Sequence, residues 1–323
     1  MSILNGKHKI IVASHKNPDG DAIGSALGIA GVLKNAGHKV DVVIPDMVPS
    51  FLNWLPGYKK VLVYEFQADK VERLVKEADL LIILDLSHPD RMGDMQIILS
   101  EYPGLSLQID HHPGSGGFTT ISVIEQASGS TSELIFDFIE WIGLSRYLDK
   151  DTATCLMTGI ITDTLGFKVA SSYPGVFNVV MKLMEAGADK DRAFDQIYNQ
   201  YSENRFKLLG FSLSSRMKVF QEQGAACIYL SEKDINSFSH KKGDTEGFVN
   251  YPLSIKGIHF SVLFTEHEDY IKLSLRSSGV LDVNKIASKH FHGGGHHNAA
   301  GGKFYGTMDE ALSFFESLVK NNI

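Results

Sequence analysis

The sequence predicts an α/β protein in which a doubly wound, mostly parallel sheet forms the N-terminal domain and a smaller α+β domain follows. Two observations support this fold class. In the first half of the chain, short apolar runs alternate with helical patterns, and several runs are apolar at nearly every position, as in strands buried on both faces. In the last third the order changes, because four strand-like segments precede two helical ones.

The first domain begins with the apolar segment 8–14 (HKIIVAS), which predicts a buried strand, and the small and aliphatic residues of 22–34 predict a helix behind it. The same reasoning gives further strands at 39–44, 60–64, 79–86, 105–110 and 119–124. Further helices are expected at 68–78, 129–143, 151–164 and 173–188. Ser130, followed three residues later by Glu133, has the spacing of a capping box at a helix start.

The rest of the chain predicts a linker and the second domain. Residues 189–215 are polar and helical, and we place a helical linker at 187–202. The domains are then 1–186 and 203–323. The second domain has expected strands at 216–223, 225–231, 259–266 and 270–277, and expected helices at 282–290 and 308–319.

Composition limits the classes of function. At 323 residues the chain is long enough for two domains, each with its own core. A formal charge of −7 argues against a broad basic surface that coats duplex DNA, but a local anion site needs only a few donors. Cys155 and Cys227 form no CxxC pair and suit a reducing compartment. With no signal-peptide pattern and no long apolar run, we expect a cytoplasmic protein without a membrane span.

Carboxylates and histidines follow several predicted strands. Carboxyl ends of parallel strands meet at one sheet edge, so these side chains should converge there. Each alone is a common turn or cap residue. Five carboxylates at one edge would repel one another unless cations neutralised them, which makes the group as a whole a strong signal. The converging residues are His15, Asp19, Asp21, Asp85, Asp110 and His111, with Asp163 joining from the helical region.

The donor types indicate the metal. Oxygen and imidazole ligands without thiolate favour Mn²⁺ over structural zinc, with Mg²⁺, Fe²⁺ or Co²⁺ as alternatives. Two divalent ions roughly 3.5–4 Å apart suit the hydrolysis of phosphate esters, because they lower the pKa of a bridging water and bind phosphoryl oxygens. The sequence therefore predicts two divalent ions and hydrolytic chemistry.

Five stretches resemble the motifs of the DHH phosphoesterase family. They are HKNPDGDAIGS, LDLSHPDR, IDHHPG, GIITDT and, in the second domain, RSSGVLDVNKIASKHFHGGGHHNAAGG. Length and domain pairing are most similar to the bacterial subgroup that degrades short oligoribonucleotides and removes the 3′-phosphate of 3′-phosphoadenosine 5′-phosphate. One departure is Leu165-Gly166-Phe167, where that subgroup often has Gly-Ser-Phe after TDT.

The resemblance implies a role for each motif residue. One metal would be bound by His15, Asp19 and Asp85, and the second by Asp21, Asp85, His111 and Asp163, with Asp85 bridging. Asp110 would orient a ligand histidine, and His112 would contact the substrate phosphate or donate a proton near the leaving oxygen.

The glycine-rich stretch 293–302 predicts either a flexible loop or a phosphate-binding segment whose backbone N–H groups approach the ligand closely. The resemblance favours the second, with Arg276, Ser277, Gly294, Gly295 and His296 binding the nucleotide end opposite the scissile phosphate. Nearby aromatic residues either stack on a base or pack in the core, and their alternation within strands favours packing; they are Phe260, Phe264 and Tyr270.

The sequence motifs are compatible with several activities. The expected partners are short single-stranded oligonucleotides or a phosphorylated mononucleotide. Alternatives are a pyrophosphatase or exopolyphosphatase and a linear dinucleotide phosphodiesterase, since related proteins share the metal motifs. A non-catalytic nucleic-acid-binding module would require missing ligands, and all the expected ones are present. A homodimer also stays open.

Overall fold

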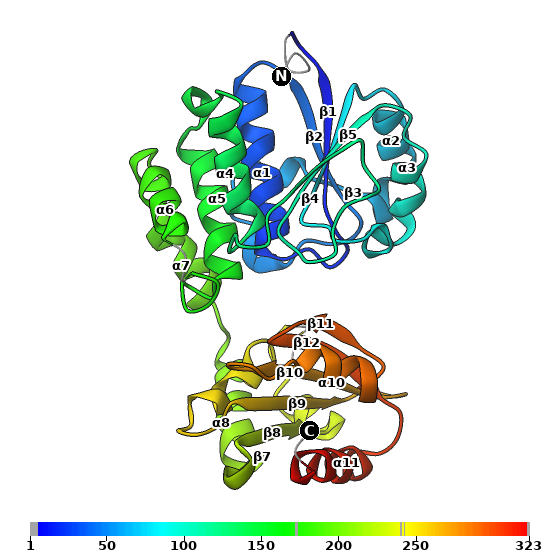
Figure 1. Cartoon of the computed structure of the whole chain (residues 1–323), viewed down its shortest axis with the longest axis vertical. Coiled ribbons are helices and arrows are strands. Elements are labelled where there is room, and N and C mark those ends of the chain that lie inside the picture. Colours follow the sequence, from blue (N-terminus) through cyan, green and yellow to red (C-terminus); the bar gives the residue numbers. More distant parts are fainter. Residues whose placement is uncertain (1–5, 172–173, 240, 242, 322–323) are drawn as a thin grey trace. The chain divides into compact units, whose positions relative to one another are not determined.

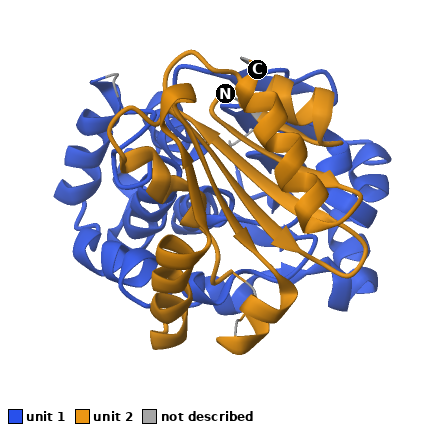
Figure 2. Cartoon of the chain, turned by 90° about the horizontal axis from the view of Figure 1, so that it is seen from below, with its two compact units in different colours: residues 1–200 blue, residues 201–323 orange. Residues whose placement is uncertain are grey.

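The computed structural model describes residues 6–171, 174–239, 241 and 243–321. The chain divides into two compact units, residues 1–200 and 201–323, which Figure 2 shows in blue and orange. The segment expected as a linker contains α7 (Lys190–Tyr198), which belongs to the first unit. The helix that follows it, α8 (Glu203–Ser215), belongs to the second unit. None of the described helices is both long and apolar enough to cross a lipid bilayer.

The first unit contains a six-stranded sheet in the order β3-β2-β1-β4-β5-β6, and each pair of neighbours is parallel, as predicted. The order reverses between β1 and β4, which is the point where such sheets bind ligands. The expected strand at 60–64 is shorter because a helix begins at Tyr64. The strands are β1 (Lys9–Ala13), β2 (Lys39–Ile44), β3 (Leu62–Val63), β4 (Leu80–Leu84), β5 (Leu105–Asp110) and β6 (Ile121–Ile124).

Helices cover both faces of this sheet (Figure 1). Side chains of β1 alternate between two cores: Ile10 and Val12 join the core of α1, α4 and α5, and Ile11 joins the core of α2 and α3. The helices are α1 (Gly20–Asn35), α2 (Tyr64–Lys76), α3 (Gln96–Ser100), α4 (Thr131–Trp141), α5 (Lys150–Asp163) and α6 (Gly175–Glu185), with 3₁₀ turns at Ser50–Leu52, Tyr58–Lys60, Pro89–Met95 and Ser145–Tyr147.

The start of α4 differs in one detail from the expected capping box. The Ser130 hydroxyl accepts the backbone N–H of Glu133 at 3.1 Å, as predicted. The Glu133 carboxylate accepts the backbone N–H of Gly129 at 2.9 Å, whereas a capping box would direct it to Ser130. Its second donor is the Ser128 hydroxyl, so Glu133 stabilises the loop that leads into the helix.

The second unit contains a mixed sheet in the order β11-β12-β10-β9-β8-β7, in which β8 and β9 are parallel. Helices α10 (Val283–His290) and α11 (Met308–Lys320) pack on one face. The other face is covered over β8 and β9 by α8 and the 3₁₀ segment Phe248–Ser254. The remaining elements are β7 (Met217–Phe220), β8 (Ala225–Leu230), β9 (Phe260–Glu266), β10 (Ile271–Ser277), β11 (Gly294–His296), β12 (Ala299–Phe304), α9 (Glu232–Ser237) and a 3₁₀ turn at Gln221–Gln223.

The glycine-rich stretch is a β-hairpin and not a flexible loop. β11 pairs with β12, and β12 in turn pairs with β10. A Cβ on Gly293 would lie 1.9 Å from the Gly301 carbonyl oxygen, and Gly295 has a φ of 153° that favours glycine. The glycines therefore allow two strands to approach very closely, a requirement that composition alone does not distinguish from flexibility.

Helices α1 and α5 also approach each other through glycine. A Cβ on Gly24 would lie 2.6 Å from the Cys155 carbonyl oxygen and 2.8 Å from the Gly159 nitrogen. A Cβ on Gly159 would lie 2.7 Å from the carboxylate of Asp21. This contact fixes α5 against the first turn of α1, where Asp21 lies.

We predict that Gly24→Ala lowers the free energy of unfolding by about 1–3 kcal/mol, because the added methyl group must displace the backbone of α5. Gly210→Ala is the control: Gly210 lies on α8 with nothing within 4 Å of its added Cβ. That change should raise stability by up to about 1 kcal/mol through helix propensity. Urea denaturation followed by circular dichroism measures both, and equal stability of the two variants would contradict the close helix contact.

Candidate metal centre

The carboxyl ends of β1, β4 and β5 deliver most of the cluster to one edge of the sheet. β1 and β4 are neighbours, so the segments that follow them lie side by side. α1 begins directly after the β1 turn, and α5 ends at the cluster. The residues brought together are His15 and Asp19 after β1, Asp21 on α1, Asp85 after β4, Asp110, His111 and His112 at the end of β5, and Asp163 at the end of α5.

The first group that can hold a metal comprises His15, Asp19 and Asp85, each with a donor atom within 4.8 Å of the others. His15 Nε2 lies 3.3 Å from Asp85 Oδ2, and both side chains are buried. His15 Nδ1 lies 2.9 Å from the carbonyl oxygen of Lys16. That carbonyl accepts the Nδ1 proton, so Nε2 is the ring nitrogen that faces the carboxylates, where it donates to Asp85 or, once deprotonated, can bind a metal ion.

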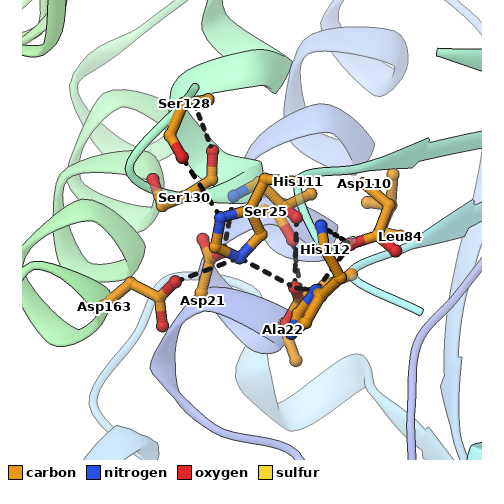
Figure 3. Close-up of polar contacts among 12 residues, drawn as sticks. Asp21, Ala22, Ser25, Leu84, Asp110, His111, His112, Ser128, Ser130 and Asp163 are labelled. Atoms are coloured by element: carbon orange, nitrogen blue, oxygen red, sulfur yellow. Dashed lines mark hydrogen bonds and ion pairs between the residues drawn. The ribbon is translucent and has the colours of Figure 1, made fainter. Parts of the chain in front are cut away.

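The second group comprises Asp21, His111 and Asp163. His111 Nε2 lies 3.2 Å from Asp163 Oδ2 and 3.7 Å from Asp85 Oδ1. The other ring nitrogen of His111 faces the carbonyl oxygen of Ser128 at 3.3 Å, and Figure 3 shows the ring between Ser128 and Asp163. Asp85 is therefore close to both groups, as expected for a bridging ligand.

Asp21 is held by a contact that no local sequence pattern indicates. Its two carboxylate oxygens accept the backbone N–H groups of Thr131 at 2.6 Å and Ser132 at 2.8 Å. These are free N–H groups in the first turn of α4, the positive end of that helix. The Thr131 hydroxyl also donates to Asp85 at 3.1 Å. The capping residue Ser130 predicts the helix start, but only the fold shows what that start binds.

Asp110 contacts His112, and its expected role of orienting a ligand histidine stays a prediction. Asp110 Oδ1 lies 2.7 Å from His112 Nδ1 (Figure 3). Asp110 also accepts the Ser115 hydroxyl. His112 Nδ1 is 3.4 Å from Asp85, and Asp85, His111 and His112 form a third group that can hold a metal. The separation of roles between His111 and His112 therefore stays a prediction.

The crowded charges alter the pKa values of the cluster. Burial, with repulsion from Asp85 and Asp163, raises the pKa of Asp21 well above its usual value. Burial also raises the pKa of Asp163, to about 6, although the His111 hydrogen bond opposes it. Burial would lower the pKa of His111, but the Asp163 hydrogen bond and nearby carboxylates raise it to about 10. Burial would raise the pKa of Asp85, but contact with His15 holds it below its usual value.

The raised pKa values of Asp21, Asp163 and His111 mean that this edge of the sheet carries an excess of negative charge and therefore binds protons. A divalent cation that binds there displaces them, because it interacts with the same carboxylates and imidazoles. The donors are oxygen and imidazole nitrogen, and the two free cysteines are buried elsewhere, in α5 and β8. Such a donor set suits hard to borderline divalent ions.

The residues expected to bind substrate lie in the second unit. Arg276 on β10 is half-buried, its guanidinium donates to the carbonyl oxygen of Leu275 at 2.9 Å, and no ion pair within the described part of the chain includes it. Burial lowers its pKa. A half-buried guanidinium without a carboxylate partner suits binding of an anion.

Two of the other residues expected to bind substrate, Ser277 and Gly295, already form hydrogen bonds within the second unit. The Ser277 hydroxyl donates to the carbonyl of Leu281 at 2.7 Å and accepts from Asn298 at 2.8 Å. The Gly295 N–H donates to Asn284 at 2.9 Å, so that backbone donor is already used. Gly294 lies beside it in β11, and the side chain of His296 is outside the described part of the structure. Phe260 and Phe264 are buried in the core, as predicted, but Tyr270 is only half-buried.

Comparison with known proteins gives consistent matches. The model of the DHH family, N-terminal domain, matches residues 9–160, and the DHHA1 domain matches residues 226–321. A bifunctional oligoribonuclease and PAP phosphatase, NrnA, of Thermus thermophilus is 30% identical over 94% of this chain and 86% of its own length. A Bacteroides fragilis structure described as an exopolyphosphatase-related protein has a TM-score of 0.96 and 40% identity, covering 99% of this chain and 94% of the other. The RecJ–Mn²⁺ structure of Thermus thermophilus shares the fold, with a TM-score of 0.51, 14% identity, and coverage of 97% of this chain and 52% of the other.

We predict that Asp85→Ala removes most of the bound divalent metal, because Asp85 belongs to two of the three possible ligand groups. Elemental analysis after dialysis against Mn²⁺ measures this. Asp90→Ala is the control, since Asp90 follows the same strand but is exposed and contacts His88. A folded Asp85→Ala protein with the metal content of the control would show that the cluster does not depend on Asp85.

Proposed function

Because the chain belongs to the DHH family of phosphoesterases, we propose that it hydrolyses short oligoribonucleotides and the 3′-phosphate of 3′-phosphoadenosine 5′-phosphate. The observation that carries this proposal is the cluster of ligand groups at the switch point of the sheet. Such groups would hold the divalent cations that hydrolysis of a phosphate ester needs, at the carboxyl ends of the strands. We take the proposed substrates from the name of the similar Thermus thermophilus protein, a bifunctional oligoribonuclease and PAP phosphatase.

We assign the metal ligands as the motif resemblance implies. His15, Asp19 and Asp85 would hold one ion, and Asp21, Asp85, His111 and Asp163 would hold the other. Mn²⁺ is favoured by the mixed oxygen and imidazole donors. Two such ions, when bound, would lower the pKa of a water molecule and neutralise charge on the phosphoryl oxygens.

The protein's own groups orient these ligands. The N-terminus of α4 binds both oxygens of Asp21, which directs that carboxylate at the centre and opposes part of the rise in its pKa that burial causes. The carbonyl oxygens of Lys16 and Ser128 each face Nδ1 of a ligand histidine and so direct Nε2 inward. In this proposal Asp110 has the corresponding role for His112, which contacts the phosphate or donates a proton to the leaving oxygen.

The second unit supplies substrate binding in this proposal. Its central group is Arg276, whose planar guanidinium can donate two hydrogen bonds to one phosphate. Ser277, Gly294, Gly295 and His296 form the surrounding segment in the resemblance, and we keep them as proposed contacts. The buried, unpaired cysteines suit action in a reducing compartment, which supports a cytoplasmic location.

Hydrolysis of pyrophosphate or polyphosphate is the second candidate, because the similar Bacteroides fragilis structure is described as exopolyphosphatase-related. One substrate panel separates the candidates. With Mn²⁺ present, kcat/KM is measured for RNA di- to pentanucleotides, 3′-phosphoadenosine 5′-phosphate, linear dinucleotides, pyrophosphate and polyphosphate. We expect the first two classes to be preferred at least tenfold, and a preference for the inorganic substrates would overturn the proposal.

We predict that His111→Ala loses metal as well as rate, whereas His112→Ala keeps both ions and loses kcat. A proton donor or phosphate contact acts mainly in the transition state and typically contributes about 10²–10⁴-fold. If His112 acts as an acid, the alkaline limb of its pH–rate profile also disappears. Metal content and kcat of each variant provide the test, and equal metal loss in both would contradict the separation of roles.

We predict that Arg276→Ala chiefly raises KM, because Arg276 binds a part of the substrate that does not react. Arg276→Lys should recover only part of the loss, since an ammonium group cannot replace a bidentate fork. Arg146→Ala, which removes an exposed arginine that stacks on Tyr147, should behave as the unaltered protein. A collapse of kcat at constant KM would place Arg276 in the chemical step.

A further inference from the structure

One face of β10 and β12 carries basic and aromatic side chains in place of a packed core. Along β10, Ile271, Leu273 and Leu275 are buried, whereas the alternate residues Lys272, Ser274 and Arg276 reach solvent. The period of two places these three side chains on the same face. Their face is opposite to the one that packs against α10 and α11.

The register of β12 extends this surface. Lys303 lies directly opposite Lys272, Gly301 opposite Ser274 and Ala299 opposite Arg276. Because Gly301 and Ala299 have at most a methyl side chain, nothing on β12 protrudes beside Ser274 and Arg276. We call this surface the basic strip and define it as Lys272, Ser274, Arg276 and Lys303 together with Tyr270, which immediately precedes β10.

The neighbouring part of the same sheet face is closed. On β9, Leu263 pairs with Ser274 and packs with Leu208 of α8 and Phe248 of the 3₁₀ segment. The basic strip is therefore bounded on one side by packed structure and is limited to β10 and β12. At its far end, Glu268 and Asp269 are exposed in the turn between β9 and β10. These acidic residues would repel an anionic chain that extended further.

Two lysines directly opposite each other on paired strands destabilise a sheet. Lys272 and Lys303 take part in no ion pair within the described part of the chain, although the protein as a whole carries a charge of −7. Lys303 Nζ lies 4.4 Å from the centre of the Tyr270 ring, and this ring stacks on His267 at 5.1 Å. The ammonium group thus has an aromatic partner while its charge stays unneutralised.

We propose that the basic strip binds the backbone of a single-stranded oligonucleotide beyond the nucleotide held at Arg276, with Tyr270 as a base-stacking surface. This inference rests on the proposed function and adds a binding site for longer substrates. Charge complementarity and continuity with Arg276 identify the occupant, since single-strand sites combine a positive track with aromatic rings. Lys272 lies four positions before Arg276 on β10, which corresponds to about 14 Å at 3.4 Å per residue. This distance exceeds the reach of a mononucleotide.

The first test is binding without catalysis. Fluorescence anisotropy in EDTA measures the Kd of labelled RNA di- and pentanucleotides for the full chain and for the double variant Lys272→Ala/Lys303→Ala. We expect the double change to weaken pentanucleotide binding about tenfold and leave dinucleotide binding unchanged. The slope of log Kd against log salt should fall by about 1.4, because each lost phosphate contact to a single strand contributes about 0.7.

The matched control is Lys218→Ala. Lys218 also lies over a tyrosine, with Nζ 5.4 Å from the Tyr229 ring, but on β7–β8 at the opposite edge of the same sheet. This variant should bind every length as the unaltered protein does, and circular dichroism checks the fold of both variants. Equal losses for both lengths, no loss for either, or equal weakening in Lys218→Ala would each overturn the inference.

A third variant separates RNA from other polyanions. Tyr270→Leu keeps an apolar side chain but removes the ring, and it should weaken binding of the pentanucleotide several-fold while leaving polyphosphate binding unchanged. If polyphosphate of equal charge competes as well as RNA and Tyr270→Leu has no effect, the strip does not recognise nucleic acid. Failure of the proposed function appears separately, as absence of oligonucleotide hydrolysis with Mn²⁺ in a protein that still binds the pentanucleotide.

Discussion

Electrostatic repulsion among carboxylates at one sheet edge is the constraint on which the first unit depends. Asp19, Asp21, Asp85, Asp110 and Asp163 lie within one cluster, and several of them are buried. The fold opposes this repulsion in three ways: three histidines lie among the carboxylates, the N-terminus of α4 binds Asp21, and the donor atoms form groups that can hold divalent cations. Each of these requires a different segment of the chain at the same place.

Sheet topology and helix packing bring these segments together. The reversal of strand order places the ends of β1 and β4 side by side, so the β1 turn reaches Asp85. Glycine contacts between α1 and α5 then bring Asp163 from the end of α5 to the same edge. Glycine at positions 24 and 159 is therefore part of the site, although neither residue has any polar side-chain group. A metal centre of this kind depends on backbone spacing as much as on its ligands.

The second unit exposes positive charge on one face of its sheet, although the protein as a whole is acidic. Its sheet packs helices against one face and against half of the other, and it leaves β10 and β12 accessible. Arg276 is held on a rigid strand, and the β-hairpin of 294–304 stabilises that strand from its edge. Groups that are carried on a sheet have a fixed backbone spacing, so the distances between their attachment points do not change when a ligand binds.

Local patterns in the sequence determined most of the strands and helices and the set of carboxylates and histidines that meet at the sheet edge. Apolar runs set the buried strands, and a histidine or carboxylate after each of β1, β4 and β5 marked the sheet edge, because chain direction alone places such residues. Tertiary structure alone decided which partners these groups meet: Asp110 contacts His112, Asp21 contacts an N-terminus 110 residues away in sequence, and the glycine-rich stretch pairs as a hairpin. It also decided that Tyr270 reaches solvent while Phe260 and Phe264 do not. The physical reason is that periodicity reports which face of an element is buried, whereas pairing between distant backbone and side-chain groups depends on register and helix contacts that no local window contains.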